Sequence, residues 1–131
     1  MTKFESLQED FEKALTRLGE VLKEEKNEIV RDSAIKRFEL AFDLAWKTTK
    51  AFLEEQHNIS CVSPRNCFRE AFRIGVIEYD DFWIELTSMR NYTVHAYSEV
   101  LAEKIYAGLP HSLEAFQKLN DALKNERTKA L

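Results

Sequence analysis

The sequence predicts an all-α protein, an up-and-down antiparallel bundle of about five helices. Apolar residues recur every three or four positions through nearly the whole chain, and no segment alternates apolar with polar residues as a strand does. The chain has only two prolines and three glycines and a hydrophobic share of 44%, so disorder is not expected. Its 131 residues suit one domain over 1–131, with a frayed polar tail after about 125.

The first two helices are predicted from their apolar stripes. The first stripe consists of Phe4, Leu7, Phe11, Leu15, Leu18 and Leu22. The charged run 23–27 closes this helix, and the second is expected to begin near Asp32 or Ser33. The second stripe consists of Ile35, Phe38, Phe42, Ala45, Thr49 and Phe52. Its aromatic members recur at core spacing and are therefore interpreted as core residues, as is Trp46.

A short third helix is predicted from residues that typically begin and end helices. Ser63 suits the N-cap and Pro64 the first helical position, and the helix is expected to run to about Ile74. Gly75 is a suitable C-terminal cap. This helix is expected to lie beside the bundle as a side element.

The last two predicted helices flank a polar segment. Asp80 or a nearby acidic residue is expected to open the fourth helix, and Ser98 to cap the fifth. Gly108 and Pro110 should kink or interrupt the fifth helix. Its stripe consists of Leu101, Ile105, Leu109, Leu113, Phe116, Leu119 and Leu123. The large aromatics Trp46 and Trp83 exceed what one small core needs, which favours an apolar dimer face.

Composition excludes several classes of function. The net charge of −4 argues against nonspecific coating of nucleic acid, although it leaves room for one basic cleft. No apolar run approaches the roughly 20 residues that span a bilayer. Residues 1–13 lack the apolar core of a signal peptide, so we expect a cytoplasmic protein without membrane contact.

Metal and cofactor sites are not expected. Cys61 and Cys67 are six apart, with no Cys-x-x-Cys or Cys–His spacing, and we predict two free, partly buried thiols. His57 and His111 lack companions at ligand spacing. The chain also lacks phosphate-binding and nucleotidyltransferase signatures, so it is not expected to transfer nucleotides itself.

The segment RNYTVHAY, residues 90–97, carries the most chemistry. Arg90 is a permanent cation whose fork fits phosphate oxygens, and His95 can exchange a proton near neutral pH. On an ideal helix these two residues are about 140° apart. Either the helix ends between them, or they meet across a two-fold axis of a homodimer. The plainer alternative is that Arg90 pairs with an acidic neighbour and His95 caps a helix.

A second cationic feature lies upstream. Arg65, Arg69 and Arg73 are four residues apart and form one stripe along the predicted third helix. The stripe can follow an RNA backbone or dock an acidic partner. Alternatively it is a solvated face paired with Glu70 or Glu78. Asp43 and Lys47, also four apart, are expected to form a surface pair.

Three segments together resemble the HEPN-domain family. They are RDSAIKRFELAFDLAWKTTKAFLEE (31–55), SPRNCFREAFRIGVI (63–77) and RNYTVHAY (90–97). The last segment combines Arg90, Asn91, His95 and Tyr97 at the spacing of the family motif. More narrowly, the chain resembles the toxin of HEPN–MNT toxin–antitoxin pairs, also described as nucleotidyltransferase substrate-binding proteins.

This resemblance implies an all-α homodimer that acts as a metal-independent ribonuclease on RNA. It assigns catalysis to Arg90 and His95, and modification by AMP to Tyr97. The partner that adds the AMP would be a minimal nucleotidyltransferase antitoxin. Independently of the resemblance, Asn91 is a candidate either to position the phosphate or to hold the helix end, and Arg65, Arg69 and Arg73 are candidates for further phosphate contacts. Two alternatives stay open: a non-catalytic substrate-binding subunit of that transferase, and a structural dimer that keeps the motif without activity.

Overall fold

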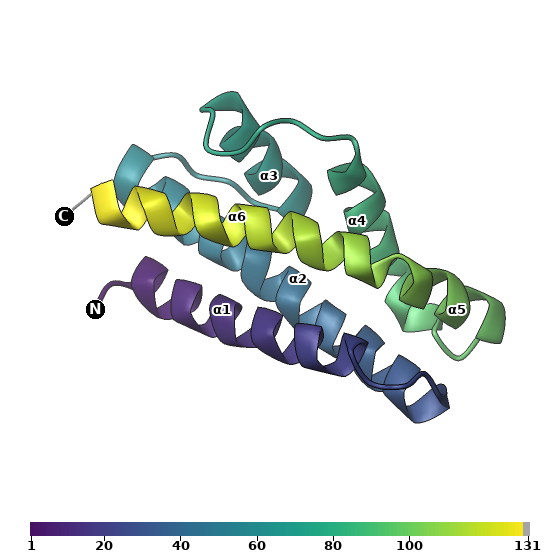
Figure 1. Cartoon of the computed structure of the whole chain (residues 1–131). Helices are drawn as coiled ribbons and strands as arrows, with labels where there is room; N and C mark the ends of the chain where they lie inside the picture. The colour runs from purple at the N-terminus through teal and green to yellow at the C-terminus, as the bar shows by residue number, and fades with distance from the viewer. Residues whose placement is uncertain (130–131) are drawn as a thin grey trace.

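The computed structural model describes residues 1–129, and all its regular elements are helical (Figure 1). Helix α1 spans Lys3–Leu22, and the Thr2 hydroxyl caps it by accepting a hydrogen bond from the Glu5 amide. Helix α2 spans Glu28–His57. It begins earlier than predicted because Asn27, rather than Asp32 or Ser33, supplies the N-cap oxygen, which accepts from the Val30 amide at 2.8 Å.

Helix α3 spans Pro64–Arg73 and confirms the predicted N-cap and first helical residue. The Ser63 hydroxyl accepts from the Asn66 amide, and Pro64 occupies the first turn. After α3 the chain reverses at Gly75, whose φ of 79° is the left-handed conformation that glycine adopts without strain. Helix α4 spans Phe82–Tyr92, and the Asp80 carboxylate accepts from the Phe82 amide at 2.9 Å. A 3₁₀ turn, η1, follows over Thr93–His95.

The predicted fifth helix is divided into two. Helix α5 spans Glu99–Ala107, with the Ser98 hydroxyl facing the Leu101 amide, and α6 spans Leu109–Lys129. The interruption falls at Gly108, as the sequence predicts. Residues 125–129 are helical because Arg127 bonds to Gln8 and Glu5 of α1. The rest of the predicted frayed tail, 130–131, lies outside the described residues.

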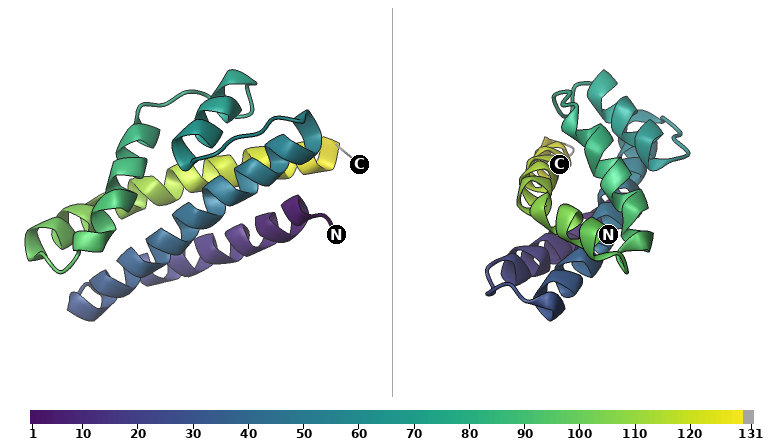
Figure 2. Two further views of the ribbon diagram at one scale, coloured as in Figure 1. Left: turned by 180° about the vertical axis from the view of Figure 1, so that it is seen from behind. Right: turned by 90° about the vertical axis from the view of Figure 1, so that its right-hand side faces the viewer.

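The long helices form an up-and-down bundle. Helices α1 and α2 run antiparallel, α4 returns alongside α2, and α6 runs antiparallel to α1 (Figure 1). Helix α3 lies beside the C-terminal half of α2 as the predicted side element, and α5 packs near the start of α2 (Figure 2). Both ends of the described chain lie at the same end of the bundle (Figures 1 and 2).

Phenylalanine rings join the helices in the core. Phe116 of α6 is fully buried and packs against Phe11, Phe38 and Trp83, with ring centroids 6.0–6.2 Å apart. It therefore joins α6 to α1, α2 and α4. Trp83 is buried in the core, so it does not contribute the exposed dimer face that the sequence analysis suggested. Trp46 is only partly buried.

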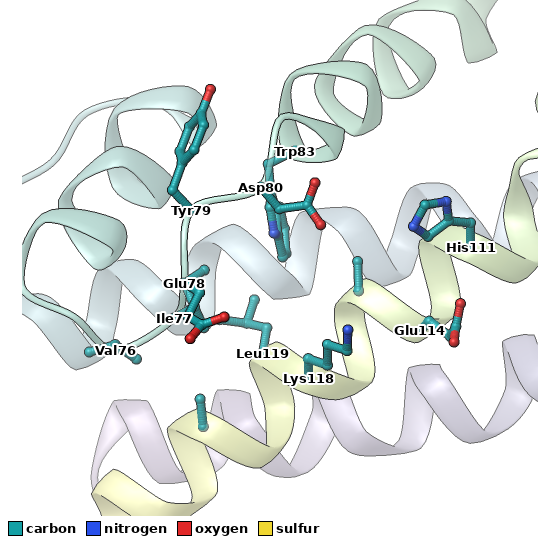
Figure 3. A pocket seen from close by; sticks show the side chains of 12 residues that line it. Val76, Ile77, Glu78, Tyr79, Asp80, Trp83, His111, Glu114, Lys118 and Leu119 are labelled. Carbon is teal, nitrogen blue, oxygen red and sulfur yellow. The ribbon is translucent and has the colours of Figure 1, made fainter.

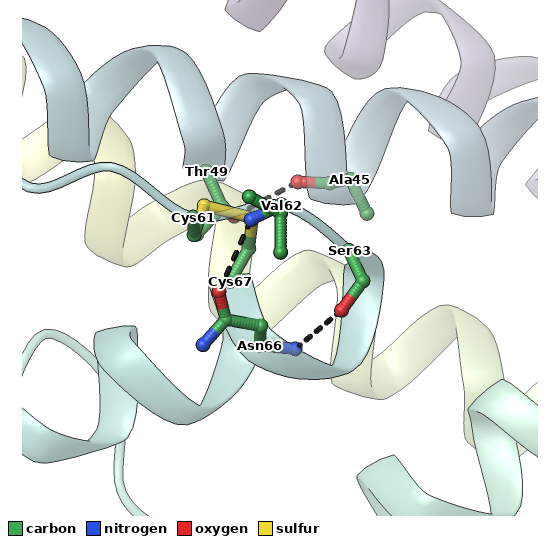
Figure 4. The surroundings of a disulfide bond; sticks show 7 residues. All are labelled: Ala45, Thr49, Cys61, Val62, Ser63, Asn66 and Cys67. Carbon is green, nitrogen blue, oxygen red and sulfur yellow. Dashed lines mark hydrogen bonds between the residues drawn. A yellow bond between two sulfur atoms is a disulfide. The ribbon is translucent and has the colours of Figure 1, made fainter.

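The two cysteines form a disulfide, so the prediction of free thiols is wrong (Figure 4). Asn66 accepts a hydrogen bond from the Val62 amide at 3.1 Å and donates its own amide to the Ser63 hydroxyl. These bonds fold the segment back on itself, and the Cα atoms of Cys61 and Cys67 lie 5.1 Å apart, within the range that a disulfide spans. Both sulfur-bearing residues are fully rather than partly buried.

A buried arginine ties α2 to α5. The Arg31 side chain is only 4% exposed, and its Nη1 donates to Glu99 at 2.6 Å and to Glu103 at 3.0 Å. Lys26 also pairs with Glu103. The hydrogen bonds from Arg31 lower the pKa of Glu99, whereas Lys26 first and Arg31 second lower the pKa of Glu103. The same bonds raise the pKa of Arg31 further above its ordinary range.

These shifts give an expected pH dependence. Both carboxyls have lowered pKa values when folded, so the unfolded chain takes up protons first as pH falls. Their contribution to the free energy of unfolding is complete above the ordinary glutamate pKa of about 4.3. It is lost below this value, as pH falls through the pKa values of the two carboxyls in the folded protein. Urea unfolding at a series of pH values should show this loss.

Two matched double variants separate the contribution of Glu99 and Glu103 from that of other carboxyls. Glu99→Gln/Glu103→Gln should flatten the acid limb of the stability curve relative to wild type. Glu24→Gln/Glu54→Gln should keep it, because neither of these exposed residues has an ion pair among residues 1–129. Identical acid limbs in all three proteins would contradict the assignment.

No helix within residues 1–129 is long and apolar enough to cross a membrane. The same residues contain no group of three or more His, Cys, Asp or Glu side chains arranged to hold a metal ion.

Candidate functional site

Arg90 lies in the last turn of α4 and faces α2. Its Nε donates to Asp43 at 3.4 Å, and Glu39 lies 4.0 Å from its Nη1. The Nη1 also donates to the Thr93 hydroxyl at 3.0 Å. The bonds to Asp43 are long and therefore weak. The guanidinium is thus held in place while part of its donor fork stays available, since arginine carries five N–H donors.

His95 ends the 3₁₀ turn and is exposed. A hydrogen bond of 3.2 Å joins its Nδ1 to the Tyr97 hydroxyl. The two rings meet edge to face, with centroids 5.8 Å apart. Tyr97 itself is 82% exposed. The Nε2 atom of His95 has no hydrogen-bond partner among residues 1–129, so it is open to a ligand.

The helix ends between Arg90 and His95, which is one of the two geometries that the spacing allows. Regular α-helix stops at Tyr92, and the chain tightens into η1 because the Thr93 hydroxyl bonds back to the Arg90 carbonyl at 2.7 Å. Arg90 also has the acidic partner that the plainer alternative foresees. No hydrogen bond joins Arg90 to His95 within the described chain. Within one chain the two residues are therefore close in sequence but are held by different partners, Asp43 and Tyr97.

The surface around the motif is unusually apolar. Four exposed side chains with large apolar parts lie along it: Tyr92, Val94, Tyr97 and Val100. Asn91 is exposed among them at the end of α4. A cavity of about 380 Å³ lies nearby between α4 and α5, with Tyr92 and Leu101 in its lining.

The predicted arginine stripe lines a groove between α3 and α4. The groove has a volume of about 670 Å³ and includes Arg65, Arg69 and Arg73 in its lining. Arg73 pairs with Glu70, its Nε lying 2.7 Å from the carboxylate. Arg65 and Arg69 are exposed and have no hydrogen-bond or ion-pair partner among residues 1–129. The paired-face alternative therefore holds for one arginine of the three.

A second cavity lies between the α3–α4 loop and α6, as Figure 3 shows. Its volume is about 270 Å³. The lining combines the carboxylates of Glu78, Asp80 and Glu114 with His111 and Lys118. These mixed charges make it a poor site for an anion. The ring of Tyr79 points away from α6 in this view, towards α3, where it packs against Phe72.

The identity of the acidic partners of Arg90 was not predicted from the sequence. Asp43 was expected to pair with Lys47 on its own helix, but it faces Arg90 instead. Glu39 lies one turn earlier on α2, so both carboxylates face the same side. Two acidic residues four apart, and therefore on one side of the helix, are the signal that could have identified this contact.

Comparison with known proteins identifies the relatives of this chain. The family described as "Nucleotidyltransferase substrate binding protein like" matches residues 6–125. A Haemophilus influenzae protein named "Probable ribonuclease HepT" is 32% identical over 87 residues, which cover 60% of this chain and 60% of that protein. That alignment therefore spans less than two thirds of the relative's length.

Two solved structures share the fold. One, from Thermus thermophilus, superposes with a TM-score of 0.82 at 32% identity and covers 86% of this chain and 98% of that one. The other, from Haemophilus influenzae, is described as the fold of a substrate binding domain of a nucleotidyltransferase. It has a TM-score of 0.66 at 22% identity and covers 92% and 96% of the two chains. With residues 6–125 matched, this chain belongs to the nucleotidyltransferase substrate-binding protein-like family.

Proposed function

We propose that this chain is a metal-independent endoribonuclease that works as a homodimer in the cytoplasm, as the toxin of a toxin–antitoxin pair. The observation that carries the proposal is the open Nε2 of His95, at the end of the helix that presents Arg90. The relative described as a probable ribonuclease supports it.

The proposed reaction uses a proton acceptor and a cation. His95 Nε2 takes the proton of a ribose 2′-hydroxyl, and the 2′ oxygen forms a bond to the neighbouring phosphorus. The bond from phosphorus to the 5′ oxygen breaks, that oxygen takes a proton from water, and the hydroxide left behind takes the proton from His95. Arg90 stabilises the charge that develops on the phosphate oxygens, and Asn91 positions the phosphate. The products are a 2′,3′-cyclic phosphate and a 5′-hydroxyl.

A homodimer would complete this site. Arg90 is held against α2, His95 is exposed, and no hydrogen bond joins the two among residues 1–129, so we expect one phosphate to be bound by Arg90 of one chain and His95 of the other. The exposed side chains of Tyr92, Val94 and Val100 supply apolar surface for a partner. Across a two-fold axis each Arg90 would meet the His95 of the other chain, because an isologous interface repeats its own patch.

A mixing experiment tests catalysis and dimer together. Arg90→Ala and His95→Ala chains should each be inactive alone. When the two are co-expressed, one site of each mixed dimer keeps an intact Arg90 and His95, so random assembly should restore about one quarter of the wild-type activity. RNA cleavage by the purified proteins measures this. No recovery, or a monomer in sedimentation at micromolar concentration, would contradict the composite site.

Control by a partner enzyme is the second part of the proposal. A minimal nucleotidyltransferase antitoxin would add AMP to Tyr97: the phenolic oxygen bonds to the α-phosphorus of ATP, pyrophosphate leaves and the phenolic proton is lost. The exposure of Tyr97 gives the partner access. Its hydroxyl lies 3.2 Å from His95 Nδ1, so an adduct there would fill the space beside the imidazole and place a negative charge beside the substrate phosphate.

Tyr97→Phe separates cleavage from control. We expect this variant to cleave RNA at a rate near wild type and to escape neutralisation by the transferase and ATP. Mass spectrometry should find the AMP adduct on the wild-type chain and on Tyr92→Phe, a matched control at another exposed tyrosine, but not on Tyr97→Phe. An unmodified Tyr97 after incubation would contradict the control mechanism.

The alternative is a non-catalytic subunit that presents a substrate to the transferase. The family description favours this alternative. The pairing of Arg90 with Asp43 also favours it, because an arginine that only binds a substrate can keep an acidic partner. In that case the wild-type chain would leave RNA intact and raise the activity of the transferase instead.

A further inference from the structure

The groove between α3 and α4 carries charge of one sign. Three arginines contribute to its lining, and none of the lining residues is acidic. Arg65 and Arg69 are exposed without an ion pair in residues 1–129, although the whole chain has a net charge of −4. The neighbouring cavity beside α6, which shares Tyr79 and Trp83 with the groove, has three carboxylates in its lining. This difference in charge between the two cavities indicates that the groove is the one that binds anions.

The groove also offers flat aromatic surface. Phe72 and Tyr79 meet edge to face at 5.3 Å, and Trp83 lies behind Phe72 at 6.3 Å. Tyr79 is 62% exposed, and its hydroxyl is held by Asp81. An exposed ring in a fixed position can stack on a base. Cations that follow a backbone, combined with aromatic rings that stack on bases, are the composition of single-strand nucleic-acid sites. Docking of an acidic protein partner would require only the cations and not the exposed aromatic rings.

One face of α4 leads from the groove towards the catalytic motif. Ile84 and Thr87 line it, and Asn91 follows them by seven and four residues. These three positions share one face of the helix. At 1.5 Å per residue, Asn91 lies about 6 Å beyond Thr87 along the axis and about 10 Å beyond Ile84. A strand bound at the motif can therefore continue directly into the groove.

We infer that this groove binds the single-stranded RNA next to the cleaved phosphodiester. Arg65 and Arg69 contact successive phosphates, and Tyr79 stacks on a base. The groove thereby sets a preference for unpaired RNA longer than the cleaved dinucleotide. This inference rests on the proposed ribonuclease function.

The kinetic test compares two substrates. For Arg65→Glu/Arg69→Glu, the KM for a single-stranded RNA of about 12 nucleotides should rise about 10- to 100-fold, because two charge-assisted phosphate contacts are lost. The kcat should stay unchanged, and so should cleavage of a dinucleotide too short to reach the groove. Tyr79→Ala should also raise the KM for the longer RNA, while Tyr79→Phe should not.

The binding test is independent of cleavage. In the His95→Ala background, fluorescence anisotropy with a labelled 12-mer should show that the double substitution lowers the slope of log affinity against log salt by about 1.4, at about 0.7 per lost phosphate contact. Lys13→Glu/Arg17→Glu on α1 makes the same charge change on exposed residues outside the groove and should leave the slope unchanged. If the glutamate variant does not fold, Arg65→Gln/Arg69→Gln replaces it in both tests.

The outcomes separate the groove from the active site. A wild-type chain that cleaves neither substrate contradicts the ribonuclease, while the anisotropy slope still tests the groove. Cleavage and binding that are both unchanged in the arginine variant would overturn the inference. So would unchanged RNA binding with a weakened complex with the nucleotidyltransferase, because the groove would then dock a protein.

Discussion

Replacing His95 with alanine is expected to lower the rate of RNA cleavage by roughly 100- to 10,000-fold, the usual contribution of a positioned proton-transfer group. Arg90→Ala should cost roughly 100- to 1,000-fold, since it removes the cation that stabilises charge on the phosphate. The His95 side chain is exposed and bonds only to Tyr97 among residues 1–129, so its loss should leave the melting temperature unchanged.

Arg90 requires a finer comparison because it also contacts Asp43 and Thr93. Arg90→Lys keeps the charge but loses the planar fork, so it should restore the ion pair with α2 without restoring full activity. His57→Ala is the matched histidine control, exposed at the far end of α2, and should be fully active. Activity that survives His95→Ala in the absence of contaminating nuclease would remove the catalytic assignment.

Phe116→Ala should be the most destabilising single substitution in the core. It removes a fully buried ring at the point where α1, α2, α4 and α6 meet. Such truncations cost about 3–5 kcal/mol, a large part of the roughly 5–15 kcal/mol that holds a domain folded. Urea unfolding with linear extrapolation measures the loss.

Two controls identify the cause of this loss as the cavity. Phe116→Leu fills most of the space and should cost clearly less than Phe116→Ala. Val62→Ala changes an exposed side chain and should stay within about 0.5 kcal/mol of wild type. A loss below about 1 kcal/mol for Phe116→Ala would mean that the four helices are not held together at this ring.

Local signals in the sequence predict most of the helix boundaries. Ser63 and Ser98 cap the helices that they were expected to cap, and Gly108 interrupts the last one, because each of these effects depends only on neighbouring residues. The start of α2 was misplaced because several residues before its apolar stripe are able to cap a helix, and Asn27 is the one that does.

Contacts between distant segments could not be read from spacing. Arg31 pairs with Glu99 and Glu103, and Arg90 with Asp43, across separations of about 50 to 70 residues. Periodicity places each residue on a helix face but does not say which helix that face meets. The pairing of Cys61 with Cys67 was missed for a related reason: the prediction used the redox compartment and metal spacing, whereas the turn made by Asn66 brings the two residues together.

The central claim, that Arg90 and His95 cleave RNA through a ribose 2′-hydroxyl, is tested most directly with an oligonucleotide carrying a single 2′-deoxyribose at the cleaved position. In the presence of a chelator, the wild-type chain should cleave the all-ribose oligonucleotide to a 2′,3′-cyclic phosphate and a 5′-hydroxyl. It should leave the deoxy-substituted bond intact while still binding that oligonucleotide as a competitive inhibitor. Cleavage at the deoxy position, or activity that disappears with the chelator, would contradict the claim.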